Sequence, residues 1–398
     1  MIPKAAIQRL RDAPWLRDPA TQRVFTLLDG ARGKTRAVGG AVRDTLVEFP
    51  REASEIDFAT ELLPDEVMRR AGEAGVAVYP TGLEHGTVTL RIGDRIAEVT
   101  TLREDIETDG RHARVKFGYD WTRDAERRDF TLNALYCDME GDLFDPVGGS
   151  DDCLAGVVRF IGEASKRIAE DRLRVYRFFR FTASHGREQF DQDGLAAVAQ
   201  AAGDLASVSS ERVGNEMRRM IALPKVARTL EAMTDAGIVA LPRDLIDRLG
   251  SYERRAHKPN GVGRLALLVH ALGSASLKRR WRLSNDEVTQ AESILTCARL
   301  LTDFRINEAV YRFPAALSDS VEVAATLAGW TEAGKSAVLQ HLENIEVPHF
   351  PLSGGDLLAR GMKPGPRIGA ELDRLEKKWI QSGFKLDRNA LLSILQPR

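Results

Sequence analysis

Two spacings of apolar residues divide the chain into an N-terminal part of mixed type and a long helical remainder. The segment 86–102 alternates polar and apolar positions around Gly93-Asp94, which is typical of a β-hairpin. The segment 55–60, EIDFAT, predicts a strand, and 35–42, TRAVGGAV, predicts a strand that runs through a glycine turn into a helix. A helix is predicted over 64–75, where Gly75 ends it.

From about residue 150 onward the apolar residues recur at helical spacing. The segment 165–186 is predicted as one helix that ends at Gly186, and residues 1–16 also have an amphipathic helical pattern. Further helices, separated by Pro and Gly, are predicted at 192–203, 209–222, 225–236, 262–273, 284–303, 319–328, 332–344 and 367–381. The predicted fold class is therefore α+β, with a small mixed α/β head around a central sheet and an all-helical remainder.

The composition narrows the class of protein. A chain of 398 residues is too long for one compact core, so about two to four domains are expected. Lys and Arg total 57 against 58 Asp and Glu, so any basic surface for nucleic acid must be local. No apolar run is long enough to span a bilayer, and the N-terminus lacks the pattern of a signal peptide. Three widely separated cysteines suggest neither a metal site nor a disulfide framework, and they favour a reducing, cytoplasmic location.

Two acids lie one residue apart in the predicted strand 55–60. Residues i and i+2 of a strand face the same side, so Glu55 and Asp57 project together. Glu98 lies in the second strand of the predicted hairpin. Carboxylates on neighbouring strands are suited to a pair of Mg²⁺ ions that stabilise an in-line phosphoryl transfer. The alternative is that Glu55 ends a loop in water and only Asp57 points inward.

The adjacent glycines upstream add a second element of this chemistry. Gly39 and Gly40 stand at a strand-to-helix turn, where backbone N–H groups can face a phosphate without a Cβ in the way. Arg43 follows one turn later and is placed to clamp the same phosphates. The alternative is a plain helix start with Arg43 and Asp44 as a surface ion pair.

Several motifs occur in an order that resembles the class II tRNA nucleotidyltransferases. These are the bacterial-type CCA-adding enzymes and their poly(A) polymerase relatives, in the superfamily of DNA polymerase beta. The resemblance covers about residues 33 to 220 strongly, with a weaker likeness near the C-terminus. The motifs read VGGAVRD, EIDFAT, EVTTLRED, DGRHARV, RRDFTLNAL, DPVGG, RFIGEASKRIAEDRLRVYRFFRF and VSSERV.

The resemblance implies a head, neck, body and tail arrangement. The expected domains are a nucleotidyltransferase head, a helical neck with a base-reading motif, a helical body and a helical tRNA-binding tail, at 1–150, 151–222, 223–300 and 301–398 respectively. The expected catalytic and metal-binding residues are Glu55, Asp57 and Glu98, with Mg²⁺ as cofactor. The expected nucleotide-binding residues are Gly39, Gly40, Arg43, Asp44, Arg111, Arg128, Asp129, Asn133, Glu170, Asp171, Arg174, Arg177 and Arg180.

The chain departs from the family at the first acid. The family has Asp-x-Asp, whereas this sequence has Glu55-Ile56-Asp57. Glutamate is one methylene longer and still ligates Mg²⁺, but the octahedral geometry of this ion is demanding. The departure predicts an altered rate or metal preference, and it leaves loss of activity open.

Two further motifs carry nucleotide contacts in the family. In RRDFTLNAL, Arg128, Asp129 and Asn133 would read the ribose and phosphates, because a 2′-hydroxyl needs a donor–acceptor partner. The alternative is a helix start capped by Asp129, and both roles can hold at once. The segment 109–115, DGRHARV, matches the flexible loop of relatives that complete the terminal A, and it contains Arg111. An ordinary charged surface loop is the alternative there.

Base choice without a nucleic-acid template is predicted for the motif EDRLRVYRFFR. Asp171, Arg174, Arg177 and Arg180 recur every three residues and are expected on one face of a helix. Asp171 can accept from the amino group of cytosine or adenine, and Arg174 can donate to the neighbouring ring nitrogen. Uracil and guanine present a carbonyl in place of the amino group, and such mismatched polar groups are rejected strongly. Glu170 would orient Arg174; the alternative is a solvated arginine stripe.

The predicted reaction is addition of CCA to the 3′ end of tRNA from CTP and ATP, with release of pyrophosphate. One alternative is a poly(A) polymerase of the same family, although this sequence ends without a strongly basic extension. The other is a catalytically silent tRNA-binding homologue, which only the glutamate at position 55 suggests. No histidine is followed by Asp, so no fused HD-type phosphohydrolase site is expected. Candidate tRNA contacts are the basic clusters at 253–258, 277–283 and 360–369.

Overall fold

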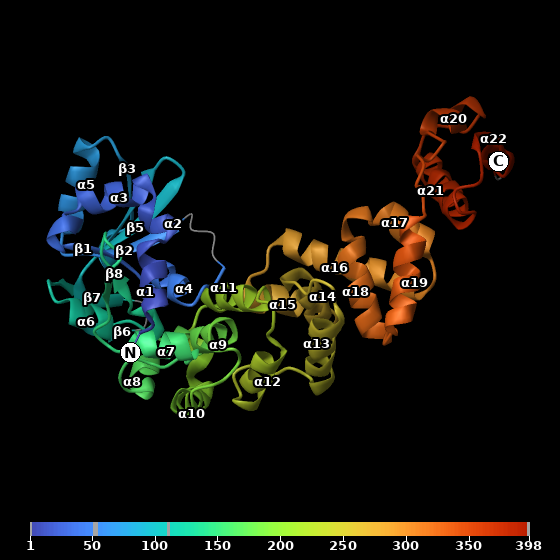
Figure 1. The fold of residues 1–398 in the computed structure, drawn as a ribbon. Coiled ribbons are helices and arrows are strands. Elements are labelled where there is room, and N and C mark those ends of the chain that lie inside the picture. The colour runs from blue at the N-terminus through green and yellow to red at the C-terminus, as the bar shows by residue number, and fades with distance from the viewer. Residues whose placement is uncertain (1, 51–54, 110–111, 396–398) are drawn as a thin grey trace. The chain divides into compact units, whose positions relative to one another are not determined.

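A computed structural model of the chain describes residues 2–50, 55–109 and 112–395, with side chains described outside 104–116. Contacts divide the chain into two compact units (Figure 1). The first unit comprises Met1–Met220 and Thr229–Ala240, and the second comprises Ile221–Arg228 and Leu241–Arg398. The four-domain division at 150, 222 and 300 is finer than these units and stays a prediction.

The N-terminal segment forms a run of short helices rather than the single helix predicted over 1–16. Helix α1 spans Lys4–Arg11, α2 spans Pro14–Arg17 and α3 spans Pro19–Leu27. Proline begins both α2 and α3, because it lacks the N–H that a helix interior needs and is preorganised for the first helical position. The prediction of one continuous helix was therefore wrong at Pro14.

A mixed seven-stranded sheet forms the centre of the first unit. Its strand order is β3-β4-β5-β2-β1-β8-β9, and β2 and β5 pair in parallel while the other neighbours are antiparallel. The strands are β1 Thr35–Val38, β2 Glu55–Thr60, β3 Ala77–Gly82, β4 Thr87–Ile92, β5 Arg95–Thr101, β8 Tyr136–Cys137 and β9 Leu143–Phe144. Strand β2 confirms the predicted strand at 55–60, and β4 with β5 confirms the predicted hairpin.

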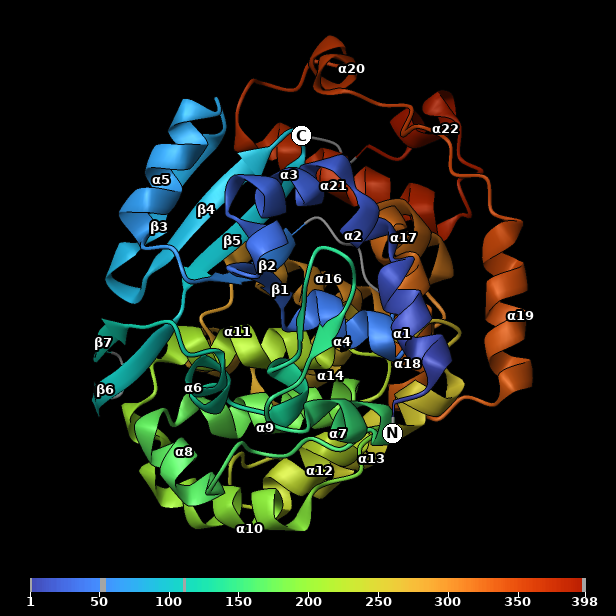
Figure 2. The same ribbon diagram turned by 60° about the vertical axis from the view of Figure 1, so that its left-hand side comes forward.

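Helices cover the sheet and bury its apolar side chains. Helix α5, Pro64–Glu73, packs on β3 and β4, and α4, Gly40–Leu46, packs on β1 and β2 (Figure 2). Phe25 of α3 meets Phe58 of β2 edge to face at 5.2 Å between ring centroids, and both side chains are buried. This packing fixes the strand that carries the two acids of EIDFAT.

A separate two-stranded sheet occupies the region where a flexible loop was predicted. Strand β6, Arg103–Asp109, pairs antiparallel with β7, His112–Phe117. The prediction of a loop over 109–115 was therefore wrong for the described part of that segment. Arg111 lies outside the described residues.

Helices make up the first unit after β9. Helix α6, Trp121–Glu126, lies before β8. The helices that follow β9 are α7 Gly149–Ala155, α8 Ala164–Glu170, α9 Leu173–Ser184, α10 Gln192–Gln200, α11 Ser210–Ile221 and α12 Ala227–Asp235. Figure 2 shows α8 to α11 gathered beside the sheet. Within the described ranges no strand follows residue 144, which confirms the predicted change to helical structure.

The predicted helix over 165–186 is two helices. Asp171 has extended backbone angles, φ −147° and ψ 104°, and ends α8. Its carboxylate accepts a hydrogen bond from the backbone N–H of Leu173, the first residue of α9, at 3.1 Å. Aspartate competes for local backbone donors in this way, which makes it a helix-end residue. The prediction that Asp171 shares a helix face with Arg174 was wrong, since Asp171 lies between the helices.

The described residues of the second unit form helices joined by loops, with no strand among them. The helices that lie wholly within it are α13 Arg243–Arg255, α14 Gly261–Leu272, α15 Ser274–Trp281, α16 Asn285–Thr302, α17 Ile306–Arg312, α18 Leu317–Ala328, α19 Glu332–Glu343, α20 Gly354–Ala359, α21 Pro366–Gln381 and α22 Arg388–Ser393. Near the C-terminus Trp379 and Leu375 belong to a buried apolar cluster.

None of the described helices has both the length and the apolar character needed to cross a bilayer. All three cysteines are buried and free.

Candidate active site

Three carboxylates converge where β2 and β5 lie side by side. The parallel register places Asp57 opposite Glu98, and Glu55 projects on the same side as Asp57. One oxygen from each of the three residues lies within 4.8 Å of the others. Burial, and then the charges of Glu55 and Asp57, raise the pKa of Glu98. Clustered carboxylates of this kind fit a divalent cation with oxygen ligands, because the cation relieves their repulsion.

The glycine turn adjoins this cluster. Gly39 has φ 73° and ψ −124°, a backbone conformation that favours glycine. A Cβ at Gly39 would lie 3.9 Å from Oδ2 of Asp57 and 3.7 Å from the carbonyl oxygen of Asn133. The turn therefore brings the start of α4 next to an acid of the cluster.

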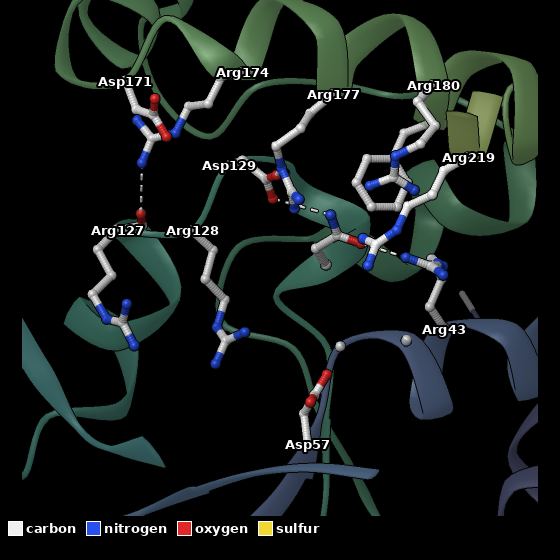
Figure 3. A pocket seen from close by; sticks show the side chains of 14 residues that line it. Arg43, Asp57, Arg127, Arg128, Asp129, Asp171, Arg174, Arg177, Arg180 and Arg219 are labelled. Carbon is white, nitrogen blue, oxygen red and sulfur yellow. Dashed lines mark hydrogen bonds and ion pairs between the residues drawn. The ribbon is translucent and has the colours of Figure 1, made fainter. Parts of the chain in front are cut away.

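A cavity of about 500 Å³ opens beside the glycine turn (Figure 3). Its lining combines one acid of the carboxylate cluster with residues of β1–α4, the segment 127–133, the junction between α8 and α9, and helices α9 and α11. The lining residues are Gly39, Gly40, Arg43, Asp57, Arg127, Arg128, Asp129, Asn133, Asp171, Arg174, Arg177, Arg180, Phe181 and Arg219. Arginines outnumber acids in this lining, so the cavity suits a polyanion such as a nucleoside triphosphate.

Asp129 and Asn133 connect the glycine turn to α9. Oδ1 of Asp129 accepts hydrogen bonds from Nδ2 of Asn133 at 3.0 Å and from the N–H of Phe130 at 2.9 Å. Nε of Arg177 donates to Oδ2 of Asp129 at 2.6 Å, and Nη1 of Arg43 donates to Oδ1 of Asn133 at 2.6 Å. Asp129 is thus a network residue of the cavity wall rather than the cap of an α-helix.

The electrostatics of Asp129 follow from these contacts. Its side chain is almost completely buried, which by itself disfavours the charged form. The charge and hydrogen bond of Arg177 and the hydrogen bond of Asn133 outweigh that burial and lower the pKa of Asp129 to about 2. Burial by itself lowers the pKa of Arg177, but the charge of Asp129 helps to raise it above its ordinary value. Both groups are therefore ionised at neutral pH.

The Asp171 carboxylate is held by an arginine that the prediction omitted. Nη2 of Arg212 donates to Oδ2 of Asp171 at 2.7 Å, and Nη1 donates to Oδ1 at 3.2 Å. Such a two-point contact fixes the plane of the carboxylate. Arg212 belongs to the motif VSSERV in α11, so the sequence contained its signal.

Arg174 is held from two sides. Its Nη1 donates to Oε2 of Glu170 at 2.6 Å and to the carbonyl oxygen of Arg167 at 2.7 Å. Its Nη2 donates to the carbonyl oxygen of Arg127 at 3.3 Å. Arg167 also donates to Glu170 and to the carbonyl oxygen of Arg128. Glu170 lies outside the cavity lining and contacts Arg174 from behind, in the place predicted for an orienting residue.

The far end of the cavity contains a group of arginines around Phe181. The guanidinium carbons of Arg43, Arg177 and Arg180 lie 5.1, 5.3 and 4.1 Å from the centroid of the Phe181 ring. Burial lowers the pKa of Arg180, which donates a hydrogen bond to Glu216 of α11. Arg219 points toward Arg43 and Arg180 in Figure 3.

Arg128 and Asp44 are held by contacts with other protein side chains. Nε of Arg128 donates to the hydroxyl of Tyr136 at 3.1 Å, and Nη2 pairs with the buried Asp124 at 3.3 Å. Burial opposes the charge of Arg128, but Tyr136 and Asp124 outweigh it and raise its pKa. Asp44 is buried behind Arg43 and lies outside the cavity lining.

The residues that the prediction missed have two explanations. Arg212, Glu216 and Arg219 follow helical spacing in the predicted helix 209–222, so a search for polar residues on one helix face would have found them. Arg127 and Arg167 contribute through backbone carbonyls as well as side chains, and residue type carries no signal for a carbonyl contact.

Comparison with family models gives two matches. Residues 35–159 match the poly A polymerase head domain. Residues 189–241 match the model described as the probable RNA and SrmB-binding site of polymerase A. The first match contains the carboxylate cluster, the glycine turn and the segment 127–133.

Curated relatives and solved structures are similar over most of the chain. A mitochondrial CCA tRNA nucleotidyltransferase 1 of Danio rerio is 34% identical over 374 residues, which cover 90% of this chain and 86% of the relative. A CCA-adding enzyme of Geobacillus stearothermophilus is 35% identical over 386 residues, covering 91% and 92%. The crystal structure of the Bacillus stearothermophilus CCA-adding enzyme in complex with CTP superposes with a TM-score of 0.75 at 29% identity, covering 92% of this chain and 94% of that one.

Proposed function

This chain belongs to the class II CCA-adding enzymes, and we propose that the cavity beside its glycine turn is the nucleotide site of the reaction. It is a nucleotidyltransferase that adds CCA to the 3′ end of tRNA. In each step the terminal 3′-hydroxyl of the RNA forms a bond to the α-phosphorus of CTP or ATP. The α–β phosphoanhydride bond breaks, and pyrophosphate leaves with the electron pair.

One observation supports the site assignment more than any other. A single cavity is lined by the acid Asp57, the turn at Gly39 and Gly40, and the polar residues Asp171 and Arg174. A nucleoside triphosphate needs these three environments at once: acids near the α-phosphate, donors for the polyphosphate, and a hydrogen-bonding edge for the base.

The polyphosphate would lie at the arginine-rich end of the cavity. Asn133 and Asp44 hold Arg43 on two edges, so its remaining N–H groups are oriented before a ligand arrives. Arg177 is partly neutralised by Asp129, and Arg180 by Glu216. Arg219 adds a further cation at this end of the cavity.

The carboxylate cluster would hold Mg²⁺. Bound Mg²⁺ would stabilise charge on the attacking and leaving oxygens, and Glu55, Asp57 and Glu98 are the residues that would hold it. Glu98, opposite Asp57 on β5, would also lie nearest the incoming hydroxyl and assist its deprotonation. The exposed position of Glu55 gives its longer side chain room to adjust to the ion.

Asp171 and Arg174 would select the base. The carboxylate of Asp171 accepts from the exocyclic amino group of cytosine or adenine, and Arg174 donates to the adjacent ring nitrogen. The contacts from Arg212 and Glu170 fix both side chains before the nucleotide binds. Asp129 and Asn133 lie in the same wall and would contact the ribose.

The test offers the purified protein Mg²⁺, a tRNA lacking its terminal CCA, and each labelled nucleotide in turn. We expect ordered incorporation of C, C and A with equimolar release of pyrophosphate. Long A tracts on unrelated RNA would instead indicate a poly(A) polymerase. Retention of the tRNA without incorporation would indicate a silent homologue. Matched reactions with Asp57→Asn control for contaminating activity.

Three further proposals concern the rest of the chain. We propose the division into head, neck, body and tail, and a cytoplasmic location. We also propose that tRNA contacts the basic clusters at 253–258, 277–283 and 360–369. The clusters are supported by their charge, because phosphate contacts dominate affinity for RNA. Removal of a true contact would flatten the salt dependence of tRNA binding.

A further inference from the structure

A buried histidine contacts the nucleotide site from behind. Nε2 of His185 lies 2.9 Å from Oδ1 of Asp44, and the two side chains are 8% and 6% exposed. The same Asp44 oxygen accepts from Nε of Arg43 at 2.8 Å and forms an ion pair with its Nη2 at 2.7 Å. Arg43 lines the nucleotide cavity, whereas His185 and Asp44 do not.

The surroundings of His185 fix both its orientation and its tautomer. Its Nδ1 lies 2.7 Å from the hydroxyl of Ser184, and its ring stacks on Phe49 with 4.6 Å between centroids. The carboxylate of Asp44 accepts from Nε2, so that nitrogen carries a hydrogen. Burial, and the positive charges of Arg43 and Arg180, lower the pKa of His185, although Asp44 acts in the opposite direction.

His185 also stands at one end of a polar network that begins and ends beside the same helix. From Asp44 the network continues through Arg43 to Asn133, whose Nδ2 donates to Asp129. Arg177 of α9 donates to Asp129, and His185 is the residue that caps the C-terminal end of α9. Two points on one helix are thereby connected to the glycine turn and to the segment 127–133.

We propose that His185 is a positioning residue for the nucleotide site. By donating to Asp44 it fixes the carboxylate that orients Arg43, and it sets the distance between α9 and the turn at Gly39. This inference rests on the function proposed above, in which Arg43 contacts the triphosphate. Its consequence is that His185 affects nucleotide binding without touching the nucleotide.

The alternative role for His185 is packing alone, because its ring stacks on Phe49. Two substitutions separate the roles. His185→Phe keeps an aromatic ring beside Phe49 but removes the donor to Asp44, whereas His185→Gln removes the ring but keeps an N–H that reaches the same carboxylate. A packing role predicts the larger defect in His185→Gln, and a positioning role predicts it in His185→Phe.

The experiment measures the Kd of CTP and ATP by calorimetry, together with kcat and KM for each nucleotide. Loss of a hydrogen bond to a charged group weakens an interaction by roughly a factor of 10 or more. We expect about a 10-fold rise in Kd and KM for both nucleotides in His185→Phe, with kcat changed by about twofold or less. His185→Gln should stay within about threefold of the unsubstituted protein. His270→Phe, an exposed histidine on α14, is the control.

A double substitution tests the route through Asp44. In an Asp44→Ala background, His185→Phe should produce no further rise in Kd, because the contact it removes is already lost. Additive effects, or an unchanged Kd in folded His185→Phe, would overturn the proposal. Calorimetric binding needs no turnover, so failure of this inference is distinguishable from failure of the proposed reaction, which incorporation of C, C and A reports separately.

Discussion

Nε of Arg177 lies 2.6 Å from Oδ2 of Asp129, and this contact joins α9 to the segment that follows α6. The two residues are 48 positions apart in sequence. Because both also line the cavity beside the glycine turn, the ion pair fixes a wall of that cavity. Arg177 and Asp129 are therefore held by contacts within the protein before any ligand binds.

The first prediction concerns base choice. Replacing Asp171 with Ala removes the proposed acceptor for the amino group of cytosine and adenine, and it removes the carboxylate that Arg212 contacts. Each unpaired polar group costs about 1–3 kcal/mol, so discrimination against UTP and GTP should fall by about 10- to 100-fold. The measurement is kcat/KM for each of the four nucleotides on a tRNA that lacks CCA.

A neighbouring acid provides the control for this prediction. Asp204→Ala removes an exposed carboxylate outside the cavity, and base choice should not change. Unchanged discrimination in Asp171→Ala would show that another group reads the base.

Much of the fold follows from local patterns, and the failures have physical causes. The strand 55–60 and the hairpin 86–102 were predicted because period-two alternation and a Gly-Asp turn are local signals. The division of 165–186 into α8 and α9 was missed because apolar spacing continues across Asp171, while the break depends on a hydrogen bond to Leu173. Helix α13 was not predicted at all, although its apolar residues are buried at helical spacing.

The candidate site was predicted in part. The proximity of Glu55, Asp57 and Glu98 required the strand order, which places β5 beside β2 although they are not consecutive. The motif order supplied that information, whereas spacing alone did not. Helical spacing marks Arg212 as a polar residue of α11, but its pairing with Asp171 depends on tertiary packing, which spacing does not give.

The second prediction concerns the carboxylate cluster. Glu98→Gln removes one of three clustered negative charges, so repulsion within the metal-free protein should fall. Without divalent ions its Tm should rise by about 1–4 °C, and the rise in Tm on adding Mg²⁺ should disappear.

Glu84→Gln, an exposed acid outside the cluster, is the control and should keep the response to Mg²⁺. A full Mg²⁺ response in Glu98→Gln would remove Glu98 from the set of metal ligands.

The third prediction concerns the longer side chain at position 55. Glu55→Asp shortens the ligand by one methylene and restores the acid found in the family. Turnover with Mg²⁺ should be preserved or should rise, and the ratio of rates with Mn²⁺ and Mg²⁺ should change, because Mg²⁺ tolerates less distortion of its coordination. Steady-state rates with each metal ion at saturating nucleotide measure this ratio. Complete loss of turnover would mean that the surrounding residues have adapted to glutamate.

The last prediction concerns the pH dependence of the ion pair between Arg177 and Asp129. The pKa of Asp129 is lowered to about 2 from an ordinary value of 3.8, so its pairing stabilises the fold above pH 3.8 and this contribution is lost as the pH falls through about 2. Arg177→Met leaves a buried carboxylate without its cation, which costs about 3–5 kcal/mol where Asp129 is ionised. The substituted protein should therefore have a lower Tm at pH 7, and its deficit in Tm should narrow as the pH falls toward 4, because Asp129 then takes up a proton.

Arg172→Met, a similar change outside the cavity, is the control and should show a small deficit in Tm that does not vary with pH. A pH-independent deficit in Arg177→Met would mean that lost packing, rather than the charge of Asp129, accounts for the effect.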